Sequence, residues 1–250
     1  MAAPTNHGTL APLQKGLFIL RRTPMAHEPY QNAVFIKSAS LLSQLPPDEG
    51  IEVAFAGRSN AGKSTLLNLV THQKGLAKTS KTPGRTQLIN TFEFAPQKRL
   101  IDLPGYGFAK VPQSVKANWQ KTLSLYLQKR DSLRGLVVLM DSRHPMKDLD
   151  CQLIEWACES ELDIHCVLTK SDKLSYSEKL NILRAVQKEI PFTNIEVQTI
   201  SAMDKSGLDI LEKKLDFWFS TPLPADQSSD QSPDQSLAQP HHDEELPPLD

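Results

Sequence analysis

An eight-residue run has the residue types and spacing of a loop that binds a triphosphate. It fits the pattern G-x-x-x-x-G-K-[ST] and consists of Gly57, Arg58, Ser59, Asn60, Ala61, Gly62, Lys63 and Ser64. Glycines let successive backbone N–H groups wrap closely around phosphates at a helix N-terminus. We expect Lys63 to reach the β- and γ-phosphates and Ser64 to give its hydroxyl to Mg²⁺. The apolar stretch before the run and the helical pattern after it predict a strand, a loop and a helix.

A second motif begins forty-five residues after Gly57, where the predicted strand that contains residues 99–101 leads into Asp102, Leu103, Pro104 and Gly105. A carboxylate at this strand end can hold Mg²⁺ through a water molecule. The N–H of Gly105 can face the γ-phosphate and sense its loss. We therefore predict that Asp102 and Gly105 act with Lys63 in catalysis.

A third motif predicts which base is bound. The predicted strand 164–168 is followed by Thr169, Lys170, Ser171 and Asp172, which resemble the [NT]-K-x-D motif of GTPases. A carboxylate at Asp172 can accept hydrogen bonds from guanine N1–H and from its exocyclic amine, a pair of donors that adenine lacks. This predicts GTP rather than ATP, because mismatched buried polar groups penalise the wrong base. The Lys170 stem would pack across the ring. Thr169 stands where many GTPases have Asn, so we expect one stabilising hydrogen bond to be weaker or rerouted.

A fourth motif follows the predicted strand 195–200 and consists of Ser201, Ala202 and Met203. It occupies the place of the loop whose backbone N–H groups support guanine O6. A fifth segment lies between the helix after Ser64 and the next strand, where a mobile switch should carry a threonine that completes the Mg²⁺ shell. We predict that Thr86 is this ligand, with Thr82 as the competitor. The predicted nucleotide contacts in this segment are Gly84, Arg85, Thr86, Gln87 and Leu88.

The elements that must position these motifs alternate along the chain. Apolar runs predict strands at 51–56, 87–94, 99–102, 136–140, 164–168 and 195–200. Helical periodicity fills the gaps, with a capping box at Ser175 and Glu178 and a closing helix over 208–218 that we expect Ser206 to cap. Such alternation is typical of a three-layer α/β/α fold of the P-loop NTPase class with a mostly parallel central sheet.

Length and composition set further bounds. The chain has 250 residues, 39% hydrophobic and 23% charged, enough for one generous α/β domain. We predict a flexible N-terminal arm at 1–30, a nucleotide-binding domain at 31–221 and a disordered acidic tail at 222–250. No apolar run approaches the length that spans a bilayer, so we expect a cytoplasmic protein without a membrane partner. Three cysteines without metal-ligand spacing are interpreted as reduced thiols.

Charge is distributed unevenly. Residues 225–250 carry seven acidic residues and no Lys or Arg, so the net charge of −1 leaves +6 for residues 1–224. Within 74–134, twelve basic residues against three acidic ones give +9. Such a concentration suits a polyanion such as RNA. Solvated Lys and Arg on exposed helix faces explain the same numbers, and the sequence leaves both interpretations open.

With these motifs in view, the chain resembles the EngB family of bacterial GTPases over about residues 30–220. The family-specific strings are GRSNAGKSTLLN, KTPGRTQLIN, DLPGYGFA and TKSD. The resemblance implies a Mg²⁺-dependent GTPase switch that binds GTP and GDP. It also implies a role in assembly of the large ribosomal subunit, through rRNA and the basic segment 74–134, and in cell division and septation. A switch that acts directly on division proteins is the alternative. A metabolic nucleotide kinase is a weaker reading, because it leaves Thr169–Asp172 unexplained.

Two residues bear on how hydrolysis proceeds. Tyr106 follows Gly105 where Ras-like proteins have the Gln that positions water, so we expect slow intrinsic hydrolysis. Asn60 matches the Asn that in related GTPases helps coordinate a monovalent cation beside the phosphates, which predicts stimulation by K⁺. The alternative for Asn60 is that it only satisfies the backbone of the loop.

Overall fold

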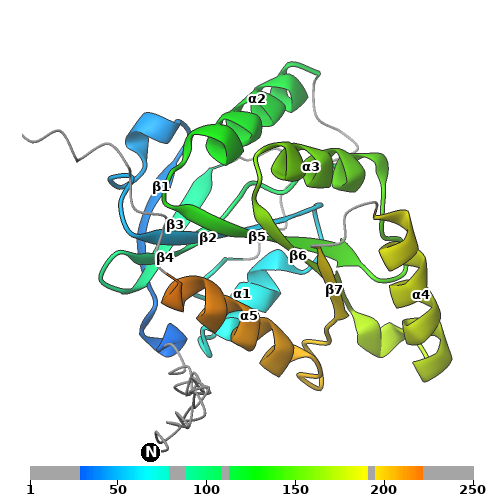
Figure 1. The fold of residues 1–250 in the computed structure, drawn as a ribbon. Helices are drawn as coiled ribbons and strands as arrows, with labels where there is room; N and C mark the ends of the chain where they lie inside the picture. The colour runs from blue at the N-terminus through cyan, green and yellow to red at the C-terminus, as the bar shows by residue number, and fades with distance from the viewer. Residues whose placement is uncertain (1–28, 79–87, 108–112, 191–194, 222–250) are drawn as a thin grey trace, which may run out of the picture.

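The computed structural model describes residues 29–78, 88–107, 113–190 and 195–221, with the backbone alone for 113–119. Within these ranges the chain forms one seven-stranded sheet in the order β1-β3-β4-β2-β5-β6-β7 (Figure 1). The strands are β1 Val34–Ala39, β2 Ile51–Gly57, β3 Ile89–Ala95, β4 Lys98–Asp102, β5 Leu133–Asp141, β6 Asp163–Thr169 and β7 Glu196–Thr199. Strand β3 pairs antiparallel with both β1 and β4, and the other pairs are parallel. The predicted mostly parallel sheet is confirmed.

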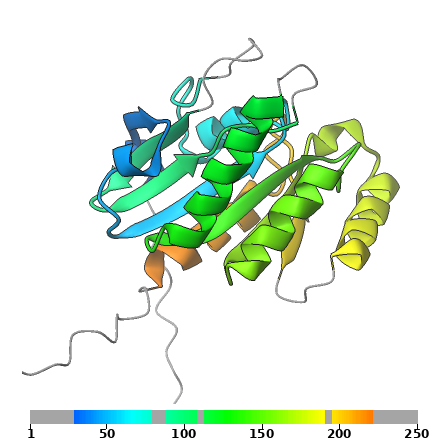
Figure 2. The same cartoon turned by 90° about the horizontal axis from the view of Figure 1, so that it is seen from above.

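Helices cover both faces of the sheet (Figures 1 and 2). They are α1 Lys63–Val70, α2 Gln113–Lys129, α3 Asp148–Glu159, α4 Tyr176–Glu189 and α5 Leu208–Ser220. Short 3-10 turns are η1 Tyr30–Asn32, η2 Leu42–Gln44 and η3 Ser171–Lys173. Helices α2 and α3 lie on one face, where buried residues of α4 join the same apolar cluster, and α1 and α5 lie on the other. The three-layer arrangement is therefore as predicted.

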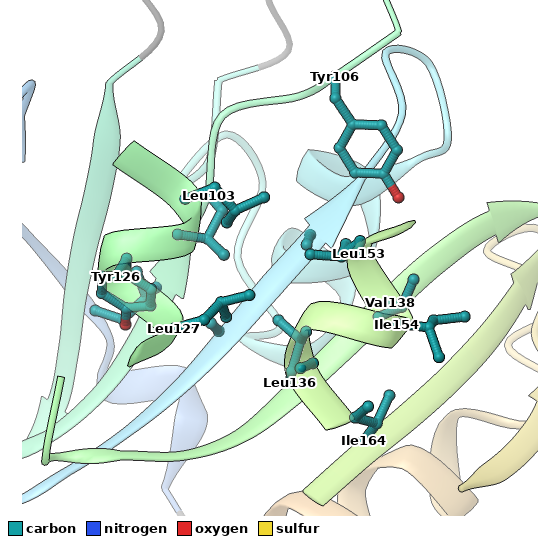
Figure 3. Close-up of a cluster of buried hydrophobic side chains, with 14 of the residues drawn as sticks. Leu103, Tyr106, Tyr126, Leu127, Leu136, Val138, Leu153, Ile154 and Ile164 are labelled. Atoms are coloured by element: carbon teal, nitrogen blue, oxygen red, sulfur yellow. The ribbon is translucent and has the colours of Figure 1, made fainter. Parts of the chain in front are cut away.

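Side-chain alternation along the central strands explains why two separate cores form. In β2, Ala54 and Ala56 face the core under α2 and α3, whereas Val53 and Phe55 face the core over α1 and α5. The same alternation in β5 leaves residues 135–140 buried throughout. A strand covered on both faces has a continuous apolar sequence, and for this reason β5 could be predicted from the sequence. Figure 3 shows the first of these cores, which includes Tyr126 and Leu127 of α2 and Leu136 and Val138 of β5.

Strand β1 and the N-terminal cap of helix α5 differ from the predictions. Strand β1 had no predicted counterpart. It is an edge strand whose first three residues, Val34, Phe35 and Ile36, are all exposed, so it lacks a clear period-two pattern. Helix α5 is capped by Gly207 rather than Ser206. Gly207 has φ +80°, and a Cβ there would lie 2.3 Å from the carbonyl oxygen of Thr199. The capping box at Ser175 and Glu178 is present as predicted.

A buried ionic cluster lies at one end of the central strands. The motif loops follow the strands at the opposite end. Glu52, fully buried, accepts hydrogen bonds from Arg130 Nη2 at 2.6 Å and from Tyr126 Oη at 2.9 Å, and it pairs with Arg99 Nη1 at 3.4 Å. Both arginines were counted in the basic segment 74–134. They face the protein interior and are not available to a polyanion, so this part of the expectation was wrong.

The N-terminal boundary also moves. Tyr30, placed in the predicted arm, is buried, and its hydroxyl donates to Asp216 of α5 at 2.8 Å. The packed domain therefore includes residue 30. Among the described residues no helix is long and apolar enough to cross a membrane.

Candidate nucleotide-binding site

The motif residues gather at one edge of the sheet, where parallel strands end. Phe55 of β2 pairs with Asp102 of β4, and Asp141 of β5 pairs with Thr169 of β6. Because the carboxyl ends of these strands lie side by side, the loops that follow them share one surface. Ligands of open α/β sheets bind at this edge.

The loop between β2 and α1 has the backbone of a phosphate cradle. Gly62 (φ +96°) and Asn60 (φ +64°) both adopt left-handed conformations, and Ala61 N donates to Arg58 O at 2.9 Å. Gly57 packs so closely on β5 that a Cβ would lie 2.8 Å from the carbonyl oxygen of Leu139. Glycine at Gly57 therefore lets the loop begin against its neighbouring strand, and helix α1 starts directly after Gly62.

Oxygen donors that suit Mg²⁺ flank Lys63. The ammonium of Lys63 pairs with Asp102, whose other oxygen accepts from Asn90 Nδ2 at 3.1 Å. The hydroxyl of Ser64 lies at the first turn of α1 and donates to the carbonyl of Lys78 at 3.4 Å. A hydroxyl and a carboxylate are hard-oxygen donors of the kind that Mg²⁺ takes, so these residue types fit the ion.

Backbone hydrogen bonds join the segment after β4 to the end of β2 and to the phosphate loop. Leu103 N donates to Phe55 O at 3.0 Å, and Ser59 N donates to Tyr106 O at 2.7 Å. Pro104 and Gly105 lie between these bonds, and a Cβ at Gly105 would lie 3.6 Å from Ser59 N and 3.7 Å from Gly57 O. These bonds hold residues 103–106 against the end of β2 and the phosphate loop.

The side chain of Tyr106 points into the core rather than toward this edge (Figure 3). It is 2% exposed, and its hydroxyl donates to Asp150 Oδ1 at 2.8 Å. Asp150 is itself buried at the start of α3. Tyr106 therefore has no side-chain atom free to orient a water molecule beside a phosphate.

The Thr169–Asp172 motif is tied to the phosphate loop by two hydrogen bonds. The Thr169 hydroxyl lies 2.6 Å from Ala61 O and 3.2 Å from Met140 O. The Lys170 ammonium donates to Asn60 O at 2.7 Å. The Thr169 hydroxyl thus reaches the phosphate loop from the position where many GTPases have Asn.

The third link joins Asp172 to the Ser201–Met203 loop. Ser201 Oγ donates to Asp172 Oδ1 at 3.3 Å and accepts from Met203 N at 3.2 Å. Lys173 pairs with the other oxygen of Asp172 at 3.0 Å, and this hydrogen bond holds the pKa of Asp172 below its ordinary value. The carboxylate is therefore ionised at neutral pH, with two acceptor oxygens. Ala202 and Met203 are exposed, and Ser171 is buried with its N–H bonded to Ile200 O.

Some predicted contacts lie outside the described residues, namely Thr82, Gly84, Arg85, Thr86 and Gln87. Leu88 is partly buried immediately before β3. Sequence reasoning assigned no role to three residues that bond to the motifs: Asn90, Asp141 and Asp150. The one available signal was for Asp141, which directly follows a predicted strand.

Comparison with known proteins identifies the family. A family profile described as "50S ribosome-binding GTPase" matches residues 52–170. A protein of Shigella flexneri named probable GTP-binding protein EngB is 55% identical over 203 residues, which cover 80% of this chain and 97% of that protein. A protein of the same name from Mannheimia succiniciproducens is 57% identical over 196 residues, covering 78% and 96%. This chain belongs to the EngB family of GTP-binding proteins.

Solved structures agree with the EngB assignment at the level of the fold. A crystal structure of a probable EngB aligns with a TM-score of 0.55 at 23% identity, covering 66% of this chain and 96% of that one. Era from Aquifex aeolicus aligns with a TM-score of 0.52 at 22% identity, covering 70% and 58%. As an EngB protein, the chain is a GTPase with a P-loop fold. The resemblance drawn from the four sequence strings is confirmed.

Proposed function

We propose that this GTPase reads guanine with Asp172 and binds the triphosphate and Mg²⁺ at Gly57–Ser64, and that it acts as a slow switch on assembling large ribosomal subunits. The observation that carries the proposal is the set of bonds that tie the base motif to the phosphate loop, Thr169 to Ala61 and Lys170 to Asn60. These bonds fix the distance between the part that reads a base and the part that holds phosphates.

Ser64 and Asp102 are the described residues that would hold Mg²⁺, with Thr86 as the predicted third. Bound there, the ion would neutralise charge on the β- and γ-phosphate oxygens during phosphoryl transfer. Lys63 pairs with Asp102 in this structure, and its flexible stem can carry the ammonium to the phosphates. Asn90 would keep the Asp102 carboxylate oriented while Lys63 moves.

Slow hydrolysis follows from the position of Tyr106. Its phenol is buried and bonded to Asp150, so the residue after Gly105 supplies no group that orients water. A GTPase without such a group keeps its GTP-bound state for longer. This is the property a switch needs if release from a large particle is to wait for hydrolysis.

The ribosomal partner is supported by exposed basic residues and by the description of the matching family profile. Lys74 and Lys78 lie in the segment after α1, beside the site, and Lys121 and Lys129 lie farther along α2. We propose that these side chains contact phosphates of rRNA. The site of action would then be the cytoplasm, and an effect on division and septation would follow from ribosome supply.

Nucleotide binding to Asp172→Asn tests base recognition. We expect wild type to prefer GTP over ATP by more than 100-fold, and the variant to lose most of that preference, because an amide at this position offers one acceptor and adds a donor. Asp209→Asn on α5 is the matched control and should keep the preference, because that carboxylate is exposed and pairs with Lys213 at 3.7 Å. An unchanged preference in Asp172→Asn would remove the base-recognition assignment.

Co-sedimentation with large-subunit particles tests the partner. In the GTP form we expect binding that falls steeply between 50 and 200 mM salt, since phosphate contacts release counterions. Lys74→Gln combined with Lys78→Gln should weaken binding uniformly. Absence of binding at low salt, together with capture of a division protein, would favour the alternative of a switch on protein partners.

A further inference from the structure

Asp141 is a carboxylate at the centre of the site edge that belongs to none of the nucleotide-binding motifs. It is the last residue of β5 and pairs in register with Thr169 at the end of β6. Its side chain is 19% exposed. Four donors converge on its two oxygens. Lys170 Nζ lies 2.8 Å from Oδ2, Arg143 Nη2 lies 2.7 Å from Oδ2, Arg143 Nε lies 2.9 Å from Oδ1, and Arg143 N lies 3.1 Å from Oδ1.

Lys170 links this carboxylate to the phosphate loop. Its Nζ donates both to Asp141 and to the backbone carbonyl of Asn60, at 2.7 Å. Its backbone is left-handed, with φ +58°. The ammonium is therefore held between two strand ends, and the four-carbon stem of Lys170 is drawn along the surface between the base motif and the loop.

Arg143 locks Asp141 in place. Its guanidinium contacts both oxygens, and fork-to-carboxylate pairs of this kind fix geometry as well as adding energy. The Arg143 hydrogen bond, ahead of the one from Lys170, holds the pKa of Asp141 well below its ordinary range. The carboxylate is therefore ionised at neutral pH.

We propose that Asp141, held by Arg143, is a positioning residue for guanine-nucleotide binding, which clamps the Lys170 ammonium against the Asn60 carbonyl so that the Lys170 stem lies ready beneath the base. The inference rests on the proposed assignment of Thr169–Asp172 to the base. The inference adds Asp141, a residue outside the motifs, and gives Asp141 and Asp172 different roles in nucleotide binding. Asp172 reads the edge of the base, and Asp141 sets the lysine that covers its face.

An ordinary surface ion pair would make the same contacts with little consequence, since exposed pairs contribute almost nothing measurable. Two observations argue for more. The Lys170 ammonium has a second, backbone acceptor in another loop, and the carboxylate is fixed by a second residue. Both contacts reduce the rotamer freedom of the Lys170 side chain, so less of that freedom is lost when a nucleotide binds.

The separate roles of Asp141 and Asp172 predict how variants of the two residues differ. Loss of the Asp141 charge frees the Lys170 ammonium, so every nucleotide that carries the same ring shape should be held less well. GDP and IDP, which differ only in the exocyclic amine, should weaken by the same factor in Asp141→Asn. In Asp172→Asn their ratio should change, because that residue contacts the amine.

Dissociation of a fluorescent GDP derivative and its inosine counterpart from the full chain tests the proposal. We expect release 3- to 10-fold faster in Asp141→Asn, an equal factor for both nucleotides, and a thermal midpoint of the nucleotide-free protein within about 2 °C of wild type. Lys170→Met should speed release similarly, and the double variant should be no faster than Lys170→Met alone, because the two residues act through one contact. Asp163→Asn is the matched control. That carboxylate pairs with Lys214 at 3.2 Å at the opposite end of β6, so release should be as in wild type.

Wild-type release rates in Asp141→Asn while Lys170→Met and Asp172→Asn are impaired would overturn the positioning role and leave the proposed base site standing. Additive effects of Asp141→Asn and Lys170→Met would overturn it too. If none of the three variants changes release, both the proposed base site and the positioning role fall.

Discussion

The hydroxyl of Tyr106 donates a 2.8 Å hydrogen bond to the buried carboxylate of Asp150. The other oxygen of Asp150 accepts from Lys147 N at 3.0 Å, at the start of α3. Burial is the main cause that raises the pKa of both Tyr106 and Asp150. The residue after the predicted phosphate-sensing Gly105 is thus anchored to a helix on the far side of the sheet from α1. Any motion of the segment after β4 must begin beyond residue 106 or break this bond.

Tyr106→Phe tests the anchor. The ring still fills its place, but one oxygen of a buried carboxyl loses its donor, which costs about 1–3 kcal/mol. We expect urea unfolding to report a loss of that size and GTP turnover to remain within about 2-fold of wild type. Tyr176→Phe, on an exposed tyrosine of α4, should leave stability unchanged. A stable Tyr106→Phe with turnover reduced more than tenfold would mean that the phenol acts at the phosphates.

Thr169→Val tests the link between the base motif and the phosphate loop. It removes the hydroxyl that bonds to Ala61 O at 2.6 Å and leaves that carbonyl without its donor. A lost buried hydrogen bond of about 1 kcal/mol corresponds to roughly 5-fold in an equilibrium, so we expect GDP affinity to fall by about that factor. Thr169→Asn, which can donate from an amide, should retain affinity.

Thr91→Val is the matched control for this substitution. In the described part of the chain the Thr91 hydroxyl of β3 is buried with no hydrogen-bond partner. Its removal should leave GDP affinity unchanged and leave stability equal or higher, because an unsatisfied buried hydroxyl costs free energy. Equal affinities in Thr169→Val and Thr91→Val would contradict the role given to Thr169.

The pH dependence of GDP binding should reflect Asp172. The hydrogen bond from Lys173 is the main cause of its lowered pKa. A carboxyl with a lowered pKa stays ionised above its ordinary value of about 3.9 and loses its charge only as the pH falls further. We therefore expect flat affinity between pH 8 and pH 5 in titrations of fluorescent GDP. Lys173→Met should move the acid limb to higher pH, and an identical limb in both proteins would count against the pairing.

Arg130→Met tests the buried cluster around Glu52. Arg130 bonds to both oxygens of this fully buried carboxylate. Removal of one partner of a buried ion pair costs about 3–5 kcal/mol, and Glu52 would keep only the longer pair with Arg99 at 3.4 Å. We expect such a loss in urea unfolding. Lys129→Met, the exposed neighbour on α2, should preserve stability and weaken sedimentation with ribosomal particles instead, whereas a reversal of these two effects would return Arg130 to the basic surface.

The sequence was informative where a residue's role is local. Gly57 to Ser64 and Thr169 to Asp172 each lie within one strand–loop junction, and strands covered on both faces, such as β5, appear as plain apolar runs. Parallel strands then bring their carboxyl ends together without further information. Hence the motif order alone placed the candidate site at one edge of the sheet.

What the sequence could not supply were pairings between distant residues. Arg130 looks like any helix-end arginine until the fold brings it to Glu52, 78 positions earlier. Asp141 and Lys170 are 29 positions apart and become neighbours only through the β5–β6 register. Gly207 and Ser206 are both acceptable caps by type, and the close carbonyl of Thr199 decides between them.

Asn60 gives a prediction about whether K⁺ stimulates GTP hydrolysis. Its backbone is left-handed and its carbonyl is used by Lys170, yet its side chain is exposed, and its carboxamide makes no hydrogen bond to any described residue. The left-handed backbone by itself favours Asn at this position, and a carboxamide oxygen beside the phosphates is in addition a ligand type that K⁺ accepts. We expect GTP turnover in K⁺ buffer to exceed that in Na⁺ buffer by at least 5-fold and the difference to vanish in Asn60→Ala, with GDP affinity in Na⁺ unchanged. Ser59→Ala, which keeps the backbone bond to Tyr106, is the control and should retain the stimulation. Equal turnover of wild type in the two salts would leave Asn60 with its conformational role alone.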